Sequence, residues 1–140
     1  DRIAVNLKHQ FFAAQAVLPD MVAAGSGAIV NFGSTSWMAG QGGMAAYTAA
    51  KSGVLGLTRS LARDYGPHNI RVNAIAPGWI MTQRQIDLWL TPEGEDELMR
   101  RQCLKRHLLP DEIARATLFF ASEEASACTG QHYVVDGGWV

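Results

Sequence analysis

The feature that most constrains the fold of this chain is the regular alternation of helical segments with short, mainly apolar runs. A run of four to eight residues that is apolar at most positions is typical of a strand buried on both faces. Strands of this kind joined by helices form parallel sheets, with right-handed crossovers and helices on both faces. The sequence therefore predicts an α/β fold with a doubly wound parallel sheet of the Rossmann type. In chain order, the expected helices and strands cover residues 3–22, 28–32, 45–65, 70–76, 110–122 and 132–135.

The first and last helices carry apolar residues that should face the core. In the first, apolar side chains recur every three or four residues, the repeat of one helical face, and Pro19 should kink or loosen this helix. The mixed segment 79–105 is predicted to be a flap with short helices. The inward-facing residues are expected to be Ile3, Leu7, Phe11, Ala14, Leu18 and Val22 in the first helix, and Ile113, Ala116, Leu118, Phe119 and Phe120 in the last.

The number of strands is small for a fold of this type. Three strands are predicted, whereas an average sheet has about five or six. The chain also begins at Asp1 rather than at a methionine and enters a helical pattern at once. We therefore expect residues 1–140 to form a single partial domain, the C-terminal catalytic half of the fold, without its N-terminal dinucleotide-binding half.

Composition and charge exclude several classes of protein. Lys and Arg total 12 against 13 Asp and Glu, giving a net charge of −1, which argues against nucleic acid or an anionic membrane as the main partner. No apolar run approaches the roughly 20 residues that span a bilayer. The two cysteines have no CxxC spacing, and the four histidines show no paired ligand spacing, so we expect a reduced cytoplasmic protein with no metal site.

The most informative segment for chemistry runs from residue 31 to residue 51. Tyr47 and Lys51 are four residues apart on an expected helix, so their side chains share one face. A free tyrosine titrates near pH 10, and a nearby ammonium favours its phenolate, which suits acid–base work. Ser34 stands thirteen residues before Tyr47, at the end of a strand, where open α/β sheets bind ligands. A surface tyrosine packed on a lysine stem would have the same spacing as Tyr47 and Lys51. The chemical interpretation is favoured by three features that agree with it: Ser34 after a strand, the small residues of the helix, and Pro77-Gly78 at the end of the next strand.

Five motifs occur in a fixed order along the chain. They are Val5-Asn6-Leu7, Ile29-Val30-Asn31 leading to Ser34, Tyr47-Thr48-Ala49-Ala50-Lys51-Ser52-Gly53, Arg71-Val72-Asn73 with Pro77-Gly78, and Val135-Asp136-Gly137-Gly138. In this set and order the sequence closely resembles the short-chain dehydrogenase/reductase family over essentially all of its length.

The resemblance implies roles for four catalytic residues. Tyr47 would be the general acid/base, and Lys51 would favour the tyrosine phenolate and bind the ribose of a nicotinamide cofactor. Ser34 would orient and polarise the substrate carbonyl, and Asn6 would hold a water in a proton relay behind the lysine. The alternative for Asn6 is a polar residue that only distorts its helix.

The resemblance also implies a cofactor, NAD or NADP. Besides Tyr47 and Lys51, the residues expected to contact it are Pro77, Gly78, Ile80 and Thr82. Asn73 is expected to support the backbone locally, and Asp136 to be a turn residue. The sequence contains no TGxxxGxG glycine loop, so the preference between the two cofactors stays open and the isolated chain is expected to be inactive.

The substrate is expected to be a small alcohol or sugar. The flap resembles that of family members that oxidise aldoses at the anomeric carbon, and the expected substrate contacts are Ser36, Trp79, Gln83 and Arg84. The alternative for Trp79 and Trp89 is packing. Two other functions stay open: a 3-oxoacyl or other ketone reductase, and a non-catalytic fragment active only in association. The resemblance further implies a homodimer or homotetramer formed through the helices that begin at Asp1 and Ala45.

Overall fold

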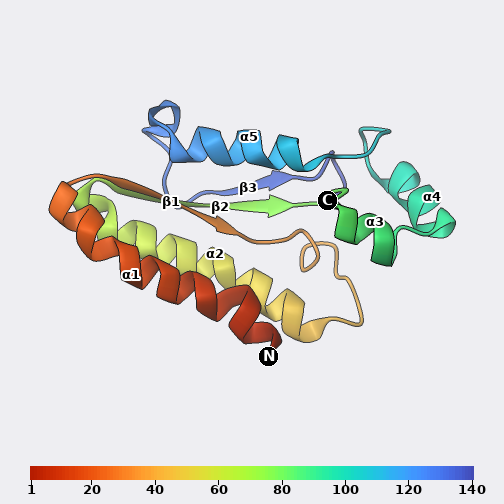
Figure 1. Ribbon diagram of the computed structural model, residues 1–140, viewed down its shortest axis with the longest axis horizontal. Helices are drawn as coiled ribbons and strands as arrows, with labels where there is room; N and C mark the ends of the chain where they lie inside the picture. Colours follow the sequence, from red (N-terminus) through yellow and green to blue (C-terminus); the bar gives the residue numbers. More distant parts are fainter.

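The computed structural model describes residues 1–140 and contains one three-stranded parallel sheet (Figure 1). The strands are β1 (Gly27–Phe32), β2 (Ile70–Pro77) and β3 (His132–Val135), in the spatial order β1-β2-β3. Gly27 pairs with Ile70, and His132 pairs with Ala74. The three apolar runs thus form the strands that the sequence predicts, and the α/β fold with a parallel, Rossmann-type sheet is confirmed.

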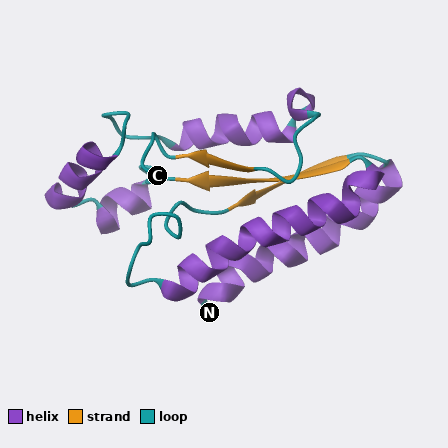
Figure 2. Ribbon diagram, turned by 180° about the vertical axis from the view of Figure 1, so that it is seen from behind, coloured by secondary structure: helices purple, strands orange, loops and turns teal.

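Helices cover both faces of the sheet. The helices α1 (His9–Ala24) and α2 (Ala45–Tyr65) lie side by side on one face, and α5 (Pro110–Ala121) covers the other (Figures 1 and 2). Leu18, Ala62 and Val72 pack together between the sheet and the helices α1 and α2, and Ile75 and Phe120 pack together between the sheet and α5. The sheet is therefore buried on both faces, which explains why its strands are apolar at consecutive positions.

The shorter elements lie mostly at one end of the molecule. The flap contains α3 (Gln83–Trp89) and α4 (Pro92–Arg101), near the carboxyl ends of the strands (Figure 1). Two 3₁₀ turns cover Gly66–His68 and Glu123–Ala125, and a π-helical turn, η1 (Ala4–Lys8), precedes α1. The flap with short helices is confirmed. No helix combines the length and the apolar character that crossing a bilayer requires.

The first helix buries the predicted face only in part: Ala14 and Leu18 are buried as expected, whereas Ile3 and Phe11 are exposed. It runs unbroken through Pro19 and ends at Gly25, whose φ of 67° suits glycine. The irregular turn lies earlier, in η1. Gln10 is 8% exposed whereas Phe11 is 47% exposed, so the assignment of Phe11 to the core is wrong. Gln10, Ala14 and Leu18 follow one another at steps of four residues in the regular helix α1, so the buried stripe passes through Gln10 instead of Phe11.

The last helix also differs from its predicted packing. Phe120 is buried and Ile113 and Ala116 pack beside it, but Leu118 is 70% exposed and Phe119 is exposed as well. Successive residues of a helix are about 100° apart, so three neighbours cannot all face one sheet. The inward assignment of Leu118 and Phe119 is therefore wrong.

Two polar residues of β2 support the backbone around them. The guanidinium of Arg71 donates to the carbonyls of Phe120 and Ser122 at 2.8 Å each, which satisfies the carboxyl end of α5. The Asn73 amide donates to the Cys128 carbonyl at 2.8 Å and accepts from the Gln131 N–H at 3.1 Å. The local supporting role predicted for Asn73 is confirmed.

Candidate active site

The predicted site residues gather where the three strands end. Because the strands are parallel, the residues that follow them meet at one edge of the sheet. Ser34 follows β1, Gly78 follows β2 and Asp136 follows β3, and α2 begins at the same end of the molecule (Figure 1). This end holds Ser34, the nicotinamide loop expected at residues 77–82, and the flap.

Ser34 is held by the residues that follow it. Its Oγ accepts from the Ser36 N–H at 3.1 Å and donates to the Ser36 Oγ at 3.0 Å. Thr35 donates to the Pro77 carbonyl through its N–H at 3.3 Å and its hydroxyl at 3.4 Å. Ser36 is 7% exposed, so the structure places it behind Ser34 rather than on an open substrate surface.

Tyr47 and Lys51 lie one turn apart on α2, as their spacing predicts. The Lys51 Nζ is 5.8 Å from the centroid of the Tyr47 ring and donates to the Phe32 carbonyl at 2.9 Å. Burial lowers the pKa of Lys51 below its usual 10.5.

Asn6 lies in the π-helical turn beside α2. Its Nδ2 donates to the Arg2 carbonyl at 2.9 Å, and its own carbonyl accepts from the Gln10 Nε2 at 2.9 Å. A Cβ at Gly53 would lie 3.0 Å from a methyl carbon of Leu7, so the glycine lets η1 approach α2 closely. The structure therefore brings Asn6 to the helix that carries Tyr47 and Lys51.

The loop after β2 packs directly on the turn after β3. The Gly78 N–H donates to the Val135 carbonyl at 2.9 Å, and a Cβ at Gly78 would lie 2.5 Å from that of Asp136. The Asp136 carboxylate accepts from the N–H groups of Gly138 and Val140 at 2.8 and 2.9 Å. The prediction that Asp136 is a turn residue is confirmed, and position 78 has room only for glycine.

Ile80 and Thr82 close the base of the flap. Ile80 forms a parallel bridge with Leu108, and the Met81 N–H donates to the Leu108 carbonyl at 2.8 Å. The Ile80 N–H donates to no group of the chain. The Thr82 Oγ1 accepts from the Gln85 N–H at 3.3 Å and caps α3, which leaves its hydroxyl hydrogen free. This loop thus presents two donors near the strand ends.

The predicted substrate residues of the flap differ in exposure. Trp79 is half-buried, and its indole N–H donates to the Gln85 Oε1 at 3.0 Å. Its ring also packs edge-on against Trp139, with centroids 6.4 Å apart. Gln83 is exposed and donates to Asp87 at 2.7 Å, and Arg84 is exposed with no ion pair. Trp79 therefore packs inside the flap, whereas Gln83 and Arg84 reach solvent.

The comparisons with known proteins decide the family. A family model described as "Enoyl-(Acyl carrier protein) reductase" matches residues 1–140. The matched relatives are named as dehydrogenases and reductases, and the matches cover nearly the whole of this chain. The chain belongs to the short-chain dehydrogenase/reductase family.

Two curated relatives and one solved structure illustrate the match. The chain is 48% identical over 139 residues to D-xylose 1-dehydrogenase from Caulobacter vibrioides, a match that covers 99% of this chain and 56% of the relative. It is 49% identical over 138 residues to a probable galactose dehydrogenase from Rhizobium meliloti, covering 99% and 54%. The structure of a 4-hydroxyisoleucine dehydrogenase complexed with NADH superimposes with a TM-score of 0.93 and 33% identity, covering 99% and 57%. The chain thus spans little more than half the length of these relatives.

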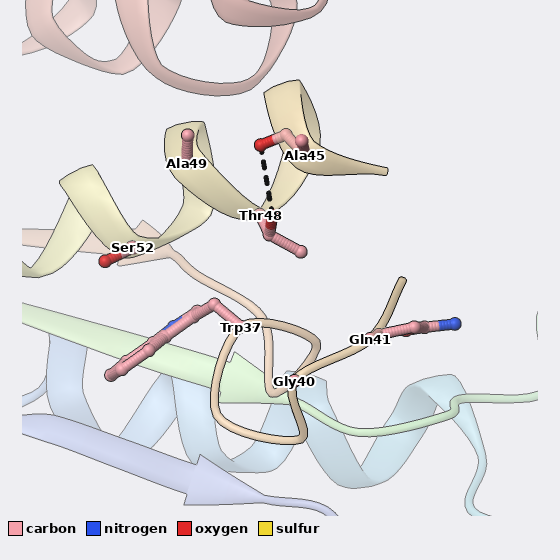
Figure 3. A pocket seen from close by; sticks show the side chains of 7 residues that line it. All are labelled: Trp37, Gly40, Gln41, Ala45, Thr48, Ala49 and Ser52. Atoms are coloured by element: carbon pink, nitrogen blue, oxygen red, sulfur yellow. Dashed lines mark hydrogen bonds between the residues drawn. The ribbon is translucent and has the colours of Figure 1, made fainter. Parts of the chain in front are cut away.

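One pocket of this short-chain dehydrogenase/reductase lies beside the candidate catalytic residues. It has a volume of about 370 Å³ and lies between the loop after β1 and the first turns of α2 (Figure 3). The Thr48 hydroxyl, on its wall, is bonded to the Ala45 carbonyl at 3.0 Å. Ser34, Tyr47 and Lys51 are not in its lining, so this pocket is separate from the candidate catalytic set. The lining residues are Trp37, Gly40, Gln41, Ala45, Thr48, Ala49 and Ser52.

Sequence reasoning missed one polar residue of the site in this dehydrogenase/reductase. Gln10 is buried on α1 and bonds to both backbone groups of Phe32. The only signal for it in the sequence is its position four residues after Asn6, within an apolar stripe. No group of three or more His, Cys, Asp or Glu side chains is placed to hold a metal ion.

Proposed function

We propose that the protein is an NAD(P)-dependent oxidoreductase that oxidises a sugar at its anomeric carbon to a lactone. The observation that carries this proposal is the Tyr47–Lys51 pair on α2, a helix that begins at the same end of the sheet as Ser34. The identity of 48–49% to two sugar dehydrogenases supports it. A sugar hydroxyl must lose a proton while its carbon loses a hydride, so a base and a hydride acceptor must meet at the substrate.

The chain's own residues account for the proton transfer. The Tyr47 hydroxyl, in its phenolate form, takes the proton from the sugar hydroxyl, and the Lys51 ammonium lies beside it, 5.8 Å from the ring centroid. The Ser34 hydroxyl donates to the substrate oxygen and stabilises charge that develops there. Asn6 holds a water behind Lys51 through which the proton leaves. Ser36 orients Ser34 because its N–H donates to the Ser34 Oγ, and the Ser34 hydroxyl hydrogen turns from the Ser36 Oγ to the substrate.

The loop after β2 fits a nicotinamide. Its carboxamide needs a donor for the oxygen, and the free N–H of Ile80 and the hydroxyl hydrogen of Thr82 supply two. Pro77 and Gly78 form the wall beside the ring, and the Lys51 ammonium binds the ribose hydroxyls. When bound, the nicotinamide supplies the hydride acceptor.

The flap supplies the sugar contacts. Gln83 and Arg84 are exposed on α3, and their amide and guanidinium groups match the hydroxyls of a sugar. Trp79 stiffens the flap beneath them through its bond to Gln85. Ser36 acts on the substrate only through Ser34.

The test uses the enzyme encoded by the complete reading frame. It is mixed with NAD⁺ or NADP⁺ and with aldoses such as D-xylose and D-galactose, and separately with secondary alcohols. We expect reduced nicotinamide and lactone from an aldose, and a loss of at least about 100-fold in kcat for Tyr47→Phe. The absence of turnover with every sugar would refute sugar oxidation.

A second candidate function is reduction of a 3-oxoacyl or other ketone substrate. The observation that favours it is the exposed apolar surface of α3, formed by Ile86, Leu88 and Trp89, which would suit an acyl chain. A 3-oxoacyl thioester offered with NADPH separates the two candidates. Reduction of the thioester without oxidation of any aldose would favour the second.

We also propose that the enzyme is a cytoplasmic homodimer or homotetramer. The exposed apolar residues Phe11, Phe12 and Val17 on α1 support an interface between copies of this helix and α2. If residues 1–140 occur as a separate polypeptide, association of its copies through this surface is the activity that it would retain. Light scattering of the purified complete protein tests the assembly, and a mass of one subunit would refute it.

A further inference from the structure

The side chain of Gln10 binds the end of β1 as a neighbouring strand would. Its Oε1 accepts from the Phe32 N–H at 2.9 Å, and its Nε2 donates to the Phe32 carbonyl at 3.2 Å. The same Nε2 donates its second hydrogen to the Asn6 carbonyl at 2.9 Å. Gln10 is 8% exposed, so these bonds are sheltered from competing water.

The orientation of the Gln10 amide is set by its partners. Exchanging its nitrogen and oxygen would place a donor against the Phe32 N–H and an acceptor against two carbonyls. Both amide hydrogens and the amide oxygen are in use. Gln10 is the side chain that holds both backbone groups of Phe32, the last residue of β1.

The Phe32 carbonyl also accepts a hydrogen bond from Lys51, whose Nζ lies 2.9 Å away. One carbonyl therefore accepts from both Gln10 and Lys51. None of the four ion pairs of the chain includes Lys51, and its pKa is lowered by burial with no acidic group contributing. The titratable group beside it is Tyr47. The position of the ammonium thus depends on the Phe32 carbonyl.

We propose that Gln10 is a positioning residue: by fixing the Phe32 carbonyl and tying it to Asn6, it holds the Lys51 ammonium beside the Tyr47 ring. This inference rests on the roles proposed above for Tyr47 and Lys51. Without the Gln10 amide, the Phe32 carbonyl loses these two restraints, and Lys51 can turn towards solvent. The phenolate of Tyr47 then loses its nearby positive charge.

The test is a direct titration of Tyr47 in the complete enzyme, which needs no substrate. Tyrosine ionisation is followed by ultraviolet absorbance, and the Tyr47→Phe form of each variant is subtracted to isolate Tyr47. Gln10→Met removes the amide and keeps the side-chain length, and Gln15→Met on the exposed side of α1 is the matched control. We expect the midpoint of Tyr47 ionisation to rise by about one pH unit in Gln10→Met and to stay at the parent value in Gln15→Met.

An unchanged midpoint in Gln10→Met would overturn the proposal, even if stability or kcat fell. If Gln10→Met does not fold, Gln10→Leu is titrated in its place. If neither variant folds while Gln15→Met does, Gln10 has a purely structural role, and this outcome also overturns the proposal. The pH profile of sugar oxidation is recorded on the same variants. A shifted Tyr47 titration in an enzyme that oxidises no sugar would refute the proposed substrate and leave the role of Gln10 supported.

Discussion

At the scale of a single residue, Lys51 has opposite consequences for activity and for stability. Burial lowers its pKa below 10.5, so in the alkaline range the unfolded chain binds more protons than the folded one. The folded state therefore gains stability as the pH rises through this range. At neutral pH the folded protein carries the cost of a half-buried ammonium, which its proposed function requires.

We predict that Lys51→Met lowers kcat by about 100-fold or more without lowering the melting temperature at pH 7. Loss of the buried charge should raise that temperature by roughly 1 to 3 °C. Scanning calorimetry and steady-state kinetics on the complete enzyme check both effects. Lys8→Met, on the exposed side of η1, is the control and should change neither quantity. A large drop in melting temperature would contradict this account.

Gly78 gives a second prediction for a single residue. An added Cβ would lie 2.5 Å from the Asp136 Cβ, so Gly78→Ala should destabilise the protein by about 1–3 kcal/mol and reduce turnover by displacing the cofactor loop. Urea denaturation measures the first effect. Gly56→Ala, inside α2 with nothing within 4 Å of the new Cβ, should be neutral or stabilising by about 0.5–1 kcal/mol. Equal behaviour of the two variants would contradict the packing argument.

The residues of the site were only partly predictable from sequence. Tyr47, Lys51 and Ser34 could be predicted because their spacing on one helix and after one strand is local. Gln10 could not, since its function depends on Phe32, twenty-two residues away. Ser36 has a buried hydroxyl bonded to Ser34, and no local pattern shows which of two nearby serines faces outward.

At the scale of elements, the start of α5 depends on one ion pair. The Arg106 guanidinium donates to both oxygens of Glu112, at 2.7 and 2.9 Å, and the Leu109 N–H donates to the same carboxylate at 2.9 Å. These bonds lower the pKa of Glu112 to about 2. Because that pKa lies below its unfolded value of 4.5, the contribution is present above pH 4.5 and is lost as the pH falls towards 2.

We predict that Glu112→Gln destabilises the protein at pH 7 by about 1 kcal/mol, a figure reduced for solvent screening. The difference from the parent should shrink steadily between pH 4.5 and pH 3. Urea denaturation at several pH values measures it. Glu124→Gln, at an exposed position of the turn after α5, should show no such trend, and a pH-independent difference at position 112 would contradict the assignment.

The boundaries of elements were more predictable than their buried faces. The helix predicted over residues 45–65 and the strand predicted over 132–135 have those bounds in the structure, because glycine, proline and apolar runs mark them locally. The faces of α1 and α5 were not predictable in the same way. Which of two neighbouring residues, such as Gln10 and Phe11, faces the sheet depends on packing partners far away in sequence.

At the scale of the whole molecule, β1 is an edge strand with one pairing partner. An edge strand presents unpaired backbone groups and favours association. We predict that residues 1–140 expressed alone associate with one another and show no saturable binding of NADH. The complete enzyme should bind NADH saturably. Fluorescence titration and a thermal-shift assay compare the two proteins. Saturable binding with turnover by the 140 residues would contradict this prediction.

The bridge between Ile80 and Leu108 has a consequence for how specificity can change. It closes the base of the flap, and the N–H groups of Cys103 and Leu104 attach the end of the flap to the carbonyls of Gly138 and Gly137, so residues 82–102 leave and re-enter the molecule between fixed points. The contacts of Ser34, Tyr47 and Lys51 described above are all made outside that excursion. A flap of another length or composition could therefore replace this one while the proton-transfer groups stay in place. Related enzymes can then acquire new substrates and keep the same catalytic residues.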